Sequence, residues 1–468
     1  MSLGARSEAL ERLATSEELD VLVVGGGITG GGVALDAASR GLSVGLVERA
    51  DFASGTSSKS SKLVHGGLRY LEQRDFGLVR EASTERGLLA RLAPQLVVPI
   101  PFVIPVSRRA LRAKFGVGLW TYDALASFKN LRIHRYVDPE ETERLVPPLP
   151  KAKLRGGFVF YDSKTDDVRL VMEVLMAARR HGAVVVNHAA AVNLESSEAG
   201  CEVEVQDAGS GDRFTVRARR VIVAAGVWGD AVERLADPDA AARLRPSKGI
   251  HLVFARDAIG LGDAAAFIPD AEHQRMLFVI PWLDSVLVGT TDTPYAGGLD
   301  EPNVDAEDRA YVLDAVNHSF RTDLDESDVA GAFAGLRPLV AGKAGQTADL
   351  SRRHSVYEMA PGIVGITGGK LTTYRRMAKD AVDRAVEDAV GSRTEWIRLG
   401  VTNLTTLGLM VQRRARRLGI PDAAASNLVR CYGNRALAVL DIAEREGLEI
   451  PLAPGGLPLA AEAVYCAR

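Results

Sequence analysis

Short, continuous apolar runs that end in glycine-rich turns recur along this chain. The first run, "DVLVV" (20–24), leads into a glycine-rich segment, and a second, "LSVGLVE" (42–48), follows it. Continuous apolar runs of this length predict strands that are buried on both faces, as in a parallel sheet. Similar runs lie at 183–195 and 220–229, after a segment at 165–182 with helical periodicity. The pattern predicts alternating strands and helices around a parallel sheet.

The rest of the chain shows other patterns. Residues 75–93 predict a long helix, and 94–150 form an irregular stretch rich in proline and arginine. Residues 246–350 alternate strand-like runs with turns, which predicts a mixed or antiparallel sheet. From about residue 403 the sequence is helical and arginine-rich, which predicts a separate C-terminal helical domain.

Composition narrows the range of functions. The 468 residues carry a formal net charge of −3, so no positive field favours nucleic acid. The three cysteines form no CxxC and the eight histidines show no metal-ligand spacing, so we expect reduced thiols and no metal. The first twenty residues lack the apolar segment of a signal peptide. The longest apolar run, 97–106, is broken by prolines and too short for a bilayer, so we expect membrane contact only at the surface.

Gly25, Gly27 and Gly30 form a GxGxxG motif where the first predicted strand turns into a helix. Glycines at this turn let the backbone approach a pyrophosphate, and the helix start offers free N–H groups. Glu48, at the end of the second strand, is placed to accept hydrogen bonds from ribose hydroxyls. This context predicts a dinucleotide-binding unit.

The segments that follow this unit favour FAD over NAD. A simple NAD domain would continue with another strand–helix–strand unit, whereas this chain continues with "SGTSSKSSKLVHGGLRY" (54–70). A late strand runs into "AAGVWG" (224–229), and a second glycine-rich turn opens a helix at 361–377. Two such turns are typical of flavoproteins that bind FAD in an extended form. We therefore predict an α/β fold with a discontinuous, glutathione-reductase-like FAD-binding domain (1–70, 155–245 and 350–392), a mixed β-sheet substrate domain (71–154 and 246–349) and a helical C-terminal domain (393–468).

Several longer motifs carry a family resemblance. "SSKLVHGGLRYLE" and "GGKLTTYR" are the most specific, and "SKGIHLV", "VIPWLDSVLVGTTDT" and "GLRPL" accompany them. With these motifs the chain resembles the FAD-dependent, quinone-linked glycerol-3-phosphate dehydrogenases of aerobic glycerol metabolism, from Asp20 to Arg468. The resemblance implies oxidation of the C2 hydroxyl of sn-glycerol 3-phosphate to the ketone of dihydroxyacetone phosphate. A hydride passes to flavin N5, and the electrons then pass to a membrane quinone.

Three other functions stay open at this point. A glycerol-3-phosphate oxidase would share the same half-reaction and reduce oxygen. A flavin oxidoreductase for an amine or a 2-hydroxy acid is disfavoured by the number of arginines and by "GGKLTTYR". A flavin-binding protein without turnover is disfavoured by the complete set of catalytic candidates.

The resemblance also implies roles for individual residues. His251 is the candidate for the base that takes the proton of the C2 hydroxyl, because an imidazole is suited to that task, and a water held by arginines is the alternative. Arg337 is the catalytic cation beside the reacting carbon. A phosphate dianion requires cationic partners. The expected substrate contacts are Arg69, Tyr70, Thr291, Arg352 (with Arg353 as the register alternative) and Lys370; Lys248 is a further candidate near the phosphate or at the substrate entrance.

The expected cofactor contacts come from five segments. Small residues and hydroxyls near position 56 would let the chain pass close to the pyrophosphate and the isoalloxazine. The set is Gly25, Gly27, Gly30, Glu48, Thr56, Ser57, Ser58, Lys62, Leu63, Gly66, Gly67, Ala191, Val192, Ala225, Gly226, Trp228, Gly369, Lys370, Leu371 and Thr372.

A basic amphipathic run at 108–125 is compatible with contact at a membrane surface, where a quinone resides. We expect a cytoplasmic protein, with peripheral docking on the inner face of the membrane and a homodimer both compatible with this interpretation. The chain ends at "AAEAVYCAR", where family members usually continue through further helices, so we expect a shortened C-terminal domain.

Overall fold

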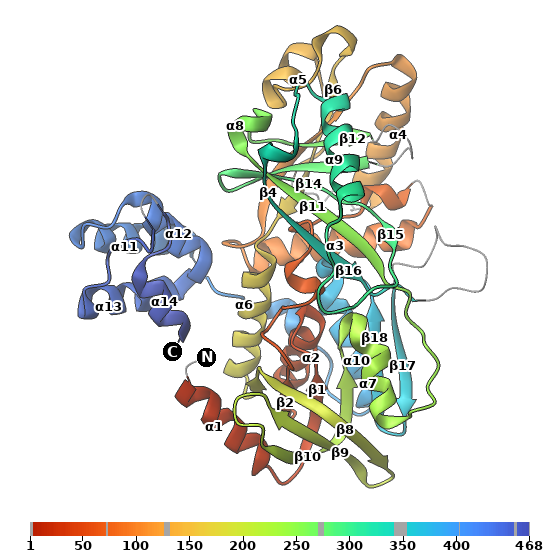
Figure 1. Cartoon of the computed structure of the whole chain (residues 1–468), viewed down its shortest axis with the longest axis vertical. Helices are drawn as coiled ribbons and strands as arrows, with labels where there is room; N and C mark the ends of the chain where they lie inside the picture. The colour runs from red at the N-terminus through yellow and green to blue at the C-terminus, as the bar shows by residue number, and fades with distance from the viewer. Residues whose placement is uncertain are drawn as a thin grey trace.

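Two β-sheets and a separate helical cluster organise the chain (Figure 1). The computed structural model describes residues 3–71, 74–125, 132–269, 276–340, 353–401, 403–453 and 456–467. The predicted α/β architecture is confirmed, with a mixed second sheet and a helical C-terminal region.

The first sheet has β1 at its centre, paired in parallel with β2 on one side and β10 on the other. β7 and β18 extend it in parallel, and β17, β9 and β8 add antiparallel strands. The order is β17-β18-β10-β1-β2-β7, with β9 and β8 attached to β10. The strands are β1 (Leu19–Val24), β2 (Val44–Val47), β7 (Val184–Val186), β8 (Ala189–Ser197), β9 (Gly200–Asp207), β10 (Arg213–Val223), β17 (His354–Ala360) and β18 (Ile363–Gly368).

Different elements bury the two faces of this sheet. On one face α2 (Ile28–Ser39), α6 (Asp167–Arg180) and α10 (Tyr374–Ala385) pack against Val21 and Val23. On the other, α1 (Leu3–Ala14) and the β8–β9 hairpin pack against Leu22. Since both faces are covered, the central strands need continuous apolar sequence, as observed.

The second sheet is mostly antiparallel and has the order β15-β11-β14-β13-β12-β4-β6-β3, with β16 paired to β11 and β5 to β6. Helix α9 (Ala306–Ser319) covers one face, and the opposite face is turned toward the functional site described below. Its strands are β3 (Leu63–Val64), β4 (Val98–Pro105), β5 (Arg135–Val137), β6 (Gly157–Lys164), β11 (Ser247–Ala255), β12 (Ala265–Pro269), β13 (Met276–Trp282), β14 (Ser285–Gly289), β15 (Thr293–Pro294) and β16 (Val329–Arg337).

The region 94–150, predicted to be irregular, contains a strand of this sheet. β4 pairs along its whole length with β6, although it carries Pro99, Pro101 and Pro105. These prolines fall on alternate positions, so their missing N–H groups share one strand edge. On the side away from β6, β4 pairs with β12 only at Phe102 and Val103, and the ladder therefore tolerates the prolines.

Sheet membership differs from the predicted domain boundary near residue 155. β6 belongs to the second sheet, so the chain returns to the first sheet only after Lys164. β3 also pairs with β6, which places residues 63–64 in the second sheet. The division into domains otherwise stays a prediction.

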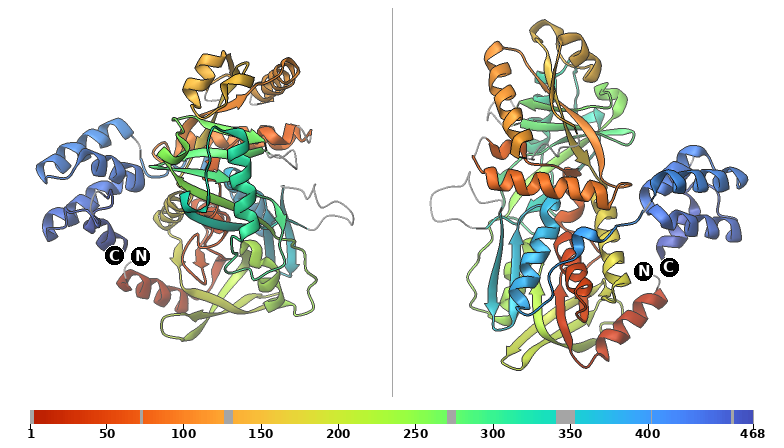
Figure 2. Two further views of the ribbon diagram at one scale, coloured as in Figure 1. Left: turned by 45° about the horizontal axis from the view of Figure 1, so that its top comes forward. Right: turned by 180° about the vertical axis from the view of Figure 1, so that it is seen from behind.

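The C-terminal helices form a cluster beside the main body (Figures 1 and 2). They share a core of their own around Val411, Leu428 and Leu440. The cluster contacts α6 through Arg435, whose Nη2 lies 2.5 Å from the buried Glu173 Oε1. Its helices are α11 (Leu404–Arg417), α12 (Asp422–Tyr432), α13 (Ala436–Glu446) and α14 (Ala460–Ala467).

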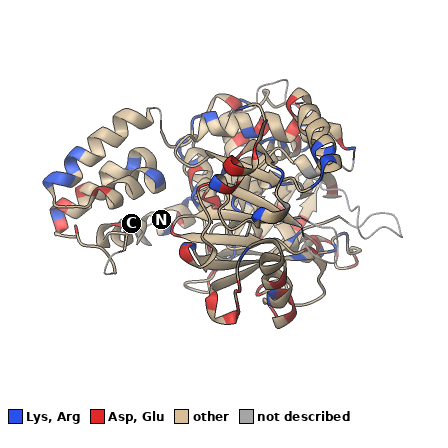
Figure 3. Ribbon diagram, turned by 90° about the horizontal axis from the view of Figure 1, so that it is seen from above, with Lys and Arg blue, Asp and Glu red and all other residues tan. Residues whose placement is uncertain are grey.

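Residues of both charges are interspersed over the molecule as seen in Figure 3. Within the described ranges no helix has the length and apolar character needed to cross a membrane.

Candidate functional site

A cavity of about 230 Å³ lies at the carboxyl ends of β1, β2 and β10, where the glycine motif turns into α2. Gly27 is the N-cap of α2, and Ser57 Oγ accepts a hydrogen bond from Ile28 N at 3.0 Å at the start of this helix. A helix start directs further backbone N–H groups toward a bound anion. Gly27 lines the cavity, and a Cβ there would lie 3.1 Å from Ser57 Oγ. Gly30 packs instead against the backbone of Gly25. The turn is shaped for a pyrophosphate.

Glu48 lies at the end of β2 with its carboxylate fixed by backbone groups. Oε2 accepts a hydrogen bond from Gly26 N at 2.6 Å, and Oε1 accepts one from Ala50 N at 2.8 Å. Glu48 lines the same cavity, at the position where a ribose follows a pyrophosphate. These residues fit the adenosine half of FAD.

Trp228 borders this cavity and packs over the residue 55 backbone, where a Cβ on Gly55 would meet the indole at 2.7 Å. Asp300, from the loop after β15, accepts a hydrogen bond from Trp228 Nε1 at 2.9 Å and pairs with Arg49. The Arg49 guanidinium lies 4.5 Å from the Trp228 ring centroid. This Arg49–Trp228–Asp300 clasp joins the two sheet-bearing parts of the molecule at the edge of the cavity.

A second cavity of about 330 Å³ lies between the second sheet and residues 56–71. It shares Thr56, Ser60 and the turn at 369–371 with the first cavity, so the two are adjacent. An extended cofactor bound in the first cavity would reach the second at this turn. The second cavity is therefore the candidate substrate site.

His251 lies in the wall of the second cavity, 2% exposed, on β11. Its Nε2 is 2.9 Å from Ser61 Oγ, and its ring stacks on Phe333 with centroids 4.9 Å apart. Burial, with the charges of Arg337 and Lys62, lowers the pKa of His251 to about 3. The imidazole is therefore neutral at pH 7 and carries a nitrogen lone pair, but the low pKa makes it a weak base that suits only a proton made acidic during the reaction.

Arg337 ends β16 and borders the same cavity. Its Nη2 donates to Thr290 Oγ1 and to the carbonyl oxygen of Thr291, both at 2.9 Å, and its Nη1 lies 3.1 Å from Asp292 Oδ1. Thr291 Oγ1 accepts from Ile250 N at 3.0 Å. The guanidinium is thus fixed in one orientation.

Tyr70 and Lys370 meet on another part of the cavity wall. Lys370 Nζ lies 4.0 Å from the Tyr70 ring centroid. Gly67, with φ of +78°, allows the turn that precedes Tyr70, and Tyr70 N donates to Gly67 O at 2.9 Å. Thr372 Oγ1 accepts from His65 N at 3.2 Å and so links this turn to the helix start after Lys370.

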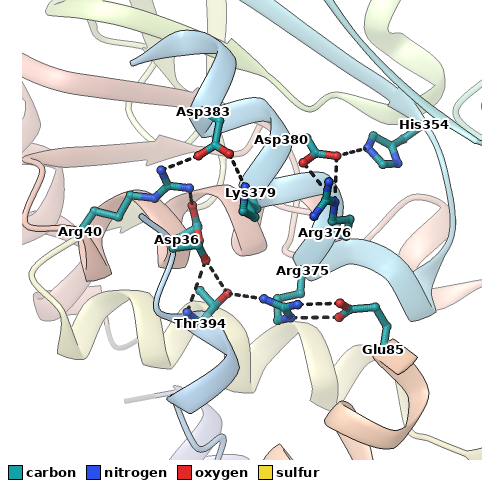
Figure 4. A network of polar contacts seen from close by, with 11 residues as sticks. Asp36, Arg40, Glu85, His354, Arg375, Arg376, Lys379, Asp380, Asp383 and Thr394 are labelled. Atoms are coloured by element: carbon teal, nitrogen blue, oxygen red, sulfur yellow. Dashed lines mark hydrogen bonds and ion pairs between the residues drawn. The ribbon is translucent and has the colours of Figure 1, made fainter. Parts of the chain in front are cut away.

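Helix α10 begins directly after the turn that follows Lys370, and ion pairs anchor it (Figure 4). Arg375 makes two hydrogen bonds to Glu85 of α3 (Phe76–Leu92), at 2.9 and 2.6 Å. On the next turns, Asp380 accepts from Arg376 and lies 2.9 Å from His354 Nε2. The helix start at Lys370–Thr373 is therefore held firmly between the two cavities.

The structure brings most of the predicted residues to the two cavities. His251, Arg337, Tyr70, Thr291 and Lys370 all line the second one. The predicted cofactor residues that line one cavity or both are Gly25, Gly27, Glu48, Thr56, Ser57, Leu63, Ala191, Ala225, Gly226, Trp228, Gly369, Lys370, Leu371 and Thr372. Their roles remain predictions.

Other predicted residues lie elsewhere. Lys62 Nζ is 2.6 Å from the buried Asp167 Oδ1, and Lys248 pairs with Asp305 and Asp308 at 2.8 and 2.5 Å. Both cations are therefore paired with carboxylates of the protein itself. Outside the two linings are Ser58, Lys62, Gly30, Gly66, Gly67, Val192 and Lys248.

Two of the arginines predicted to bind substrate are only partly described by the structure or lie outside the described residues. Arg352 lies outside the described residues, and for Arg69 only the backbone, in the 3₁₀ turn Leu68–Leu71, is described. Arg353, the register alternative, is 62% exposed and pairs with Asp75 at 2.7 Å. Of the four cations expected to meet around the substrate, Arg69, Arg337, Arg352 and Lys370, two are observed to line the second cavity, namely Arg337 and Lys370.

Sequence reasoning missed several residues of the second cavity. Lys59, three positions before Lys62 in "SSKSSK", lines the second cavity, whereas Lys62 does not. Ser61 contacts His251. Part of the wall is apolar, from residues on separate elements whose sequence gives no sign of convergence. That part comprises Leu68, Leu71, Ile104, Phe115, Leu119, Phe267, Met276 and Phe278. Among the described residues no group of His, Cys, Asp and Glu could hold a metal ion.

Comparison with known proteins adds three findings. The FAD dependent oxidoreductase family matches residues 20–375. The chain is 41% identical to glycerol-3-phosphate dehydrogenase 2 of Mycobacterium tuberculosis, over 99% of this chain and 80% of that protein. It is 38% identical to the mitochondrial glycerol-3-phosphate dehydrogenase of Arabidopsis thaliana, over 100% of this chain and 79% of that protein.

Solved structures show the same fold. The glycerol-3-phosphate dehydrogenase of Bacillus halodurans, complexed with FAD, superposes with a TM-score of 0.78 at 30% identity, covering 95% of this chain and 83% of that one. An L-α-glycerophosphate oxidase of Mycoplasma pneumoniae superposes with a TM-score of 0.66 at 20% identity, covering 82% of this chain and 98% of that one, and supports the fold alone.

Proposed function

The chain belongs to the FAD-dependent oxidoreductase family and, within it, to the glycerol-3-phosphate dehydrogenases, and from this premise we propose that it oxidises sn-glycerol 3-phosphate to dihydroxyacetone phosphate and passes the electrons to a quinone. One observation carries the substrate proposal. Arg337, Lys370 and the neutral His251 line one cavity, and that cavity adjoins the cradle into which FAD fits.

The residues divide the chemical work in this proposal. FAD, when bound, supplies the acceptor for the hydride that leaves C2. His251, oriented by Ser61, takes the hydroxyl proton as the C2–O bond becomes a carbonyl. Arg337 stabilises negative charge on the C2 oxygen. Lys370 contributes positive charge for the phosphate. The alcohol thus loses one hydride and one proton.

The apolar part of the second cavity supports a quinone as the electron acceptor. A glycerol phosphate is small and polar and gains little from phenylalanine side chains such as Phe267 and Phe278, whose ring centroids lie 4.8 Å apart. A quinone ring is planar and apolar and packs favourably on aromatic faces. Quinone reduction consumes the two electrons and two protons and gives a quinol.

Contact with a membrane surface is the matching proposal for α4 (Arg109–Leu125), whose residues Phe115 and Leu119 belong to this apolar wall. On this helix the side chain of Val117 is 70% exposed and that of Trp120 is 59% exposed. The first turns of the same helix carry the basic residues Arg109, Arg112 and Lys114. Exposed tryptophan with neighbouring cations suits a lipid interface. Sedimentation with anionic vesicles tests this, with W120A as the variant expected to bind less; equal binding of both proteins would reject the contact.

The first experiment is anaerobic. We expect sn-glycerol 3-phosphate to bleach the flavin absorbance of the purified holoenzyme, and glycerol and lactate to leave it unchanged, because glycerol has no anionic group and lactate has no phosphate dianion. Re-oxidation by a soluble quinone but slowly by air would support the dehydrogenase. Rapid re-oxidation by oxygen with release of hydrogen peroxide would identify an oxidase instead, and no bleaching by the ester would reject the substrate.

A further inference from the structure

Asp162, on β6, brings three hydrogen-bond donors to one carboxylate oxygen at the wall of the second cavity. The residue is 4% exposed. Its Oδ1 accepts from Arg86, from Tyr122 Oη at 3.2 Å and from the backbone N of Gly66 at 3.1 Å. The proposed hydride transfer assigns no role to the Asp162 carboxylate.

Arg86 and Tyr122 hold the carboxylate from behind. Arg86, on α3, is 1% exposed, and its Nη1 also donates to Tyr122 Oη at 2.8 Å and to the Tyr161 carbonyl oxygen at 3.1 Å. Burying a charge pair costs solvation free energy that only good geometry and additional hydrogen bonds offset. These hydrogen bonds provide that geometry and fix the position of Asp162 Oδ1.

The segment 65–70 lies against this cluster. A Cβ on Gly66 would lie 2.7 Å from Ser83 Oγ and closer still to Tyr122 Oη, so the backbone there is in direct contact with the cluster. On its other side the segment is bonded to Thr372 through His65 N. The Asp162 cluster and the helix start of α10 therefore grip the segment from two sides, and Tyr70 leaves it toward Lys370.

We propose that Asp162, held by Arg86 and Tyr122, is a positioning residue that fixes segment 65–70 against the Lys370 turn and so sets the affinity of the cavity for its phosphate-bearing substrate. The inference deepens the proposed function and rests on it. Asp162 acts through Gly66 N: the amide hydrogen bond places the turn, and the turn places Tyr70 beside the Lys370 ammonium group.

The test compares three variants of the holoenzyme. Asp162→Asn keeps an acceptor for Gly66 N but no longer balances the Arg86 charge, and Tyr122→Phe keeps the ion pair but removes one donor. Glu173→Gln is the matched control, because it breaks another arginine–carboxylate pair whose carboxylate is 1% exposed, at the C-terminal cluster and outside both cavities. The measurements are KM and kcat for sn-glycerol 3-phosphate, FAD content, and amide hydrogen exchange of peptides that span 63–71.

For Asp162→Asn we expect KM to rise about tenfold with unchanged FAD content, and faster exchange in 63–71. For Tyr122→Phe we expect about a two- to threefold rise in KM, and for Glu173→Gln a lower Tm with unchanged KM and exchange in 63–71. Wild-type KM and exchange in both Asp162→Asn and Tyr122→Phe would overturn the proposal. If Asp162→Asn does not fold, Tyr122→Phe decides alone.

The exchange measurement separates this inference from the proposed function. If sn-glycerol 3-phosphate fails to reduce the wild-type flavin, the proposed function is rejected, yet faster exchange in 63–71 of Asp162→Asn still supports the positioning role. If the wild type is reduced and both KM and exchange in 63–71 are the same in wild type, Asp162→Asn and Tyr122→Phe, the positioning role alone is rejected.

Discussion

Asp292 Oδ1 lies 3.1 Å from Arg337 Nη1 and holds the guanidinium at the edge of the substrate cavity. With Thr290 and Thr291 on Nη2, the planar group has its hydrogen-bonding geometry fixed on two sides. A lysine would keep the charge but could not reproduce these bonds. We expect R337K to slow anaerobic flavin reduction by about 100-fold in a stopped-flow experiment. The exposed R213K serves as the control, and a rate within threefold of wild type in R337K would contradict the assigned role.

His251 makes stability depend on pH. Its folded pKa is lowered to about 3, whereas an unfolded histidine titrates near 6.5. Between these values the unfolded state binds the extra proton, so acidification favours unfolding. We expect urea unfolding to show wild type losing about 1.7 kcal/mol more than H251N between pH 6.5 and 5. H181N, which changes an exposed histidine, should retain the wild-type slope. Equal slopes for H251N and wild type would show that the folded imidazole titrates normally.

Gly67 allows a left-handed turn that a side chain would disturb. Its φ is +78°, and a Cβ would lie 2.6 Å from Tyr70 Cε2. We expect G67A to lose about 1–3 kcal/mol of stability and to raise KM, because Tyr70 must move away from Lys370. G87A is the matched control on helix α3, where a Cβ meets nothing within 4 Å and alanine favours the helix. If G67A and G87A gave equal stabilities and KM values, the strain argument would fail.

The Arg49–Trp228–Asp300 clasp is expected to slow the loss of FAD. Asp300 reaches across from the second sheet, and exposed ion pairs of this kind contribute modestly. We expect D300A to raise the FAD dissociation rate about two- to fivefold, measured by the fluorescence that released FAD regains after dilution. E301A, at the next position on the same loop, should match wild type. A D300A rate equal to that of E301A would show that the clasp does not retain the cofactor.

Local signals in the sequence predict the first sheet well. The apolar runs at β1, β2 and β10 and the glycine turns at Gly25 and Gly369 depend on neighbouring residues, and the structure forms them where predicted. β4 was missed because its prolines contradict a central strand when taken alone. The prolines are tolerated because β4 pairs along its whole length with β6 but at only two residues with β12, and these partners cannot be read from the local sequence.

The site was predictable where a motif marks it. His251, Arg337 and Lys370 come from three distant motifs and line one cavity. Lys59 and Lys62 occupy equivalent places in "SSKSSK". Lys62 lies outside the cavity lining because it pairs with the buried Asp167, a contact that the local sequence does not indicate. Asp162 meets Gly66 across 96 positions of sequence, and no local pattern can indicate such a contact.

The central place of β1 has a consequence for the synthesis of the protein. On one side of β1, Val21 pairs with Arg220 of β10, and the strand beyond β10, β18, begins only at Ile363. The nascent chain therefore holds an apolar strand with an open edge until some two hundred further residues have left the ribosome. Pairing between residues this far apart in sequence slows folding and leaves aggregation-prone intermediates exposed for longer. Gly369, Lys370 and Leu371 line the cavity for FAD, so this cavity is complete only late in translation, and chaperone supply and flavin availability during expression should limit the yield of active enzyme.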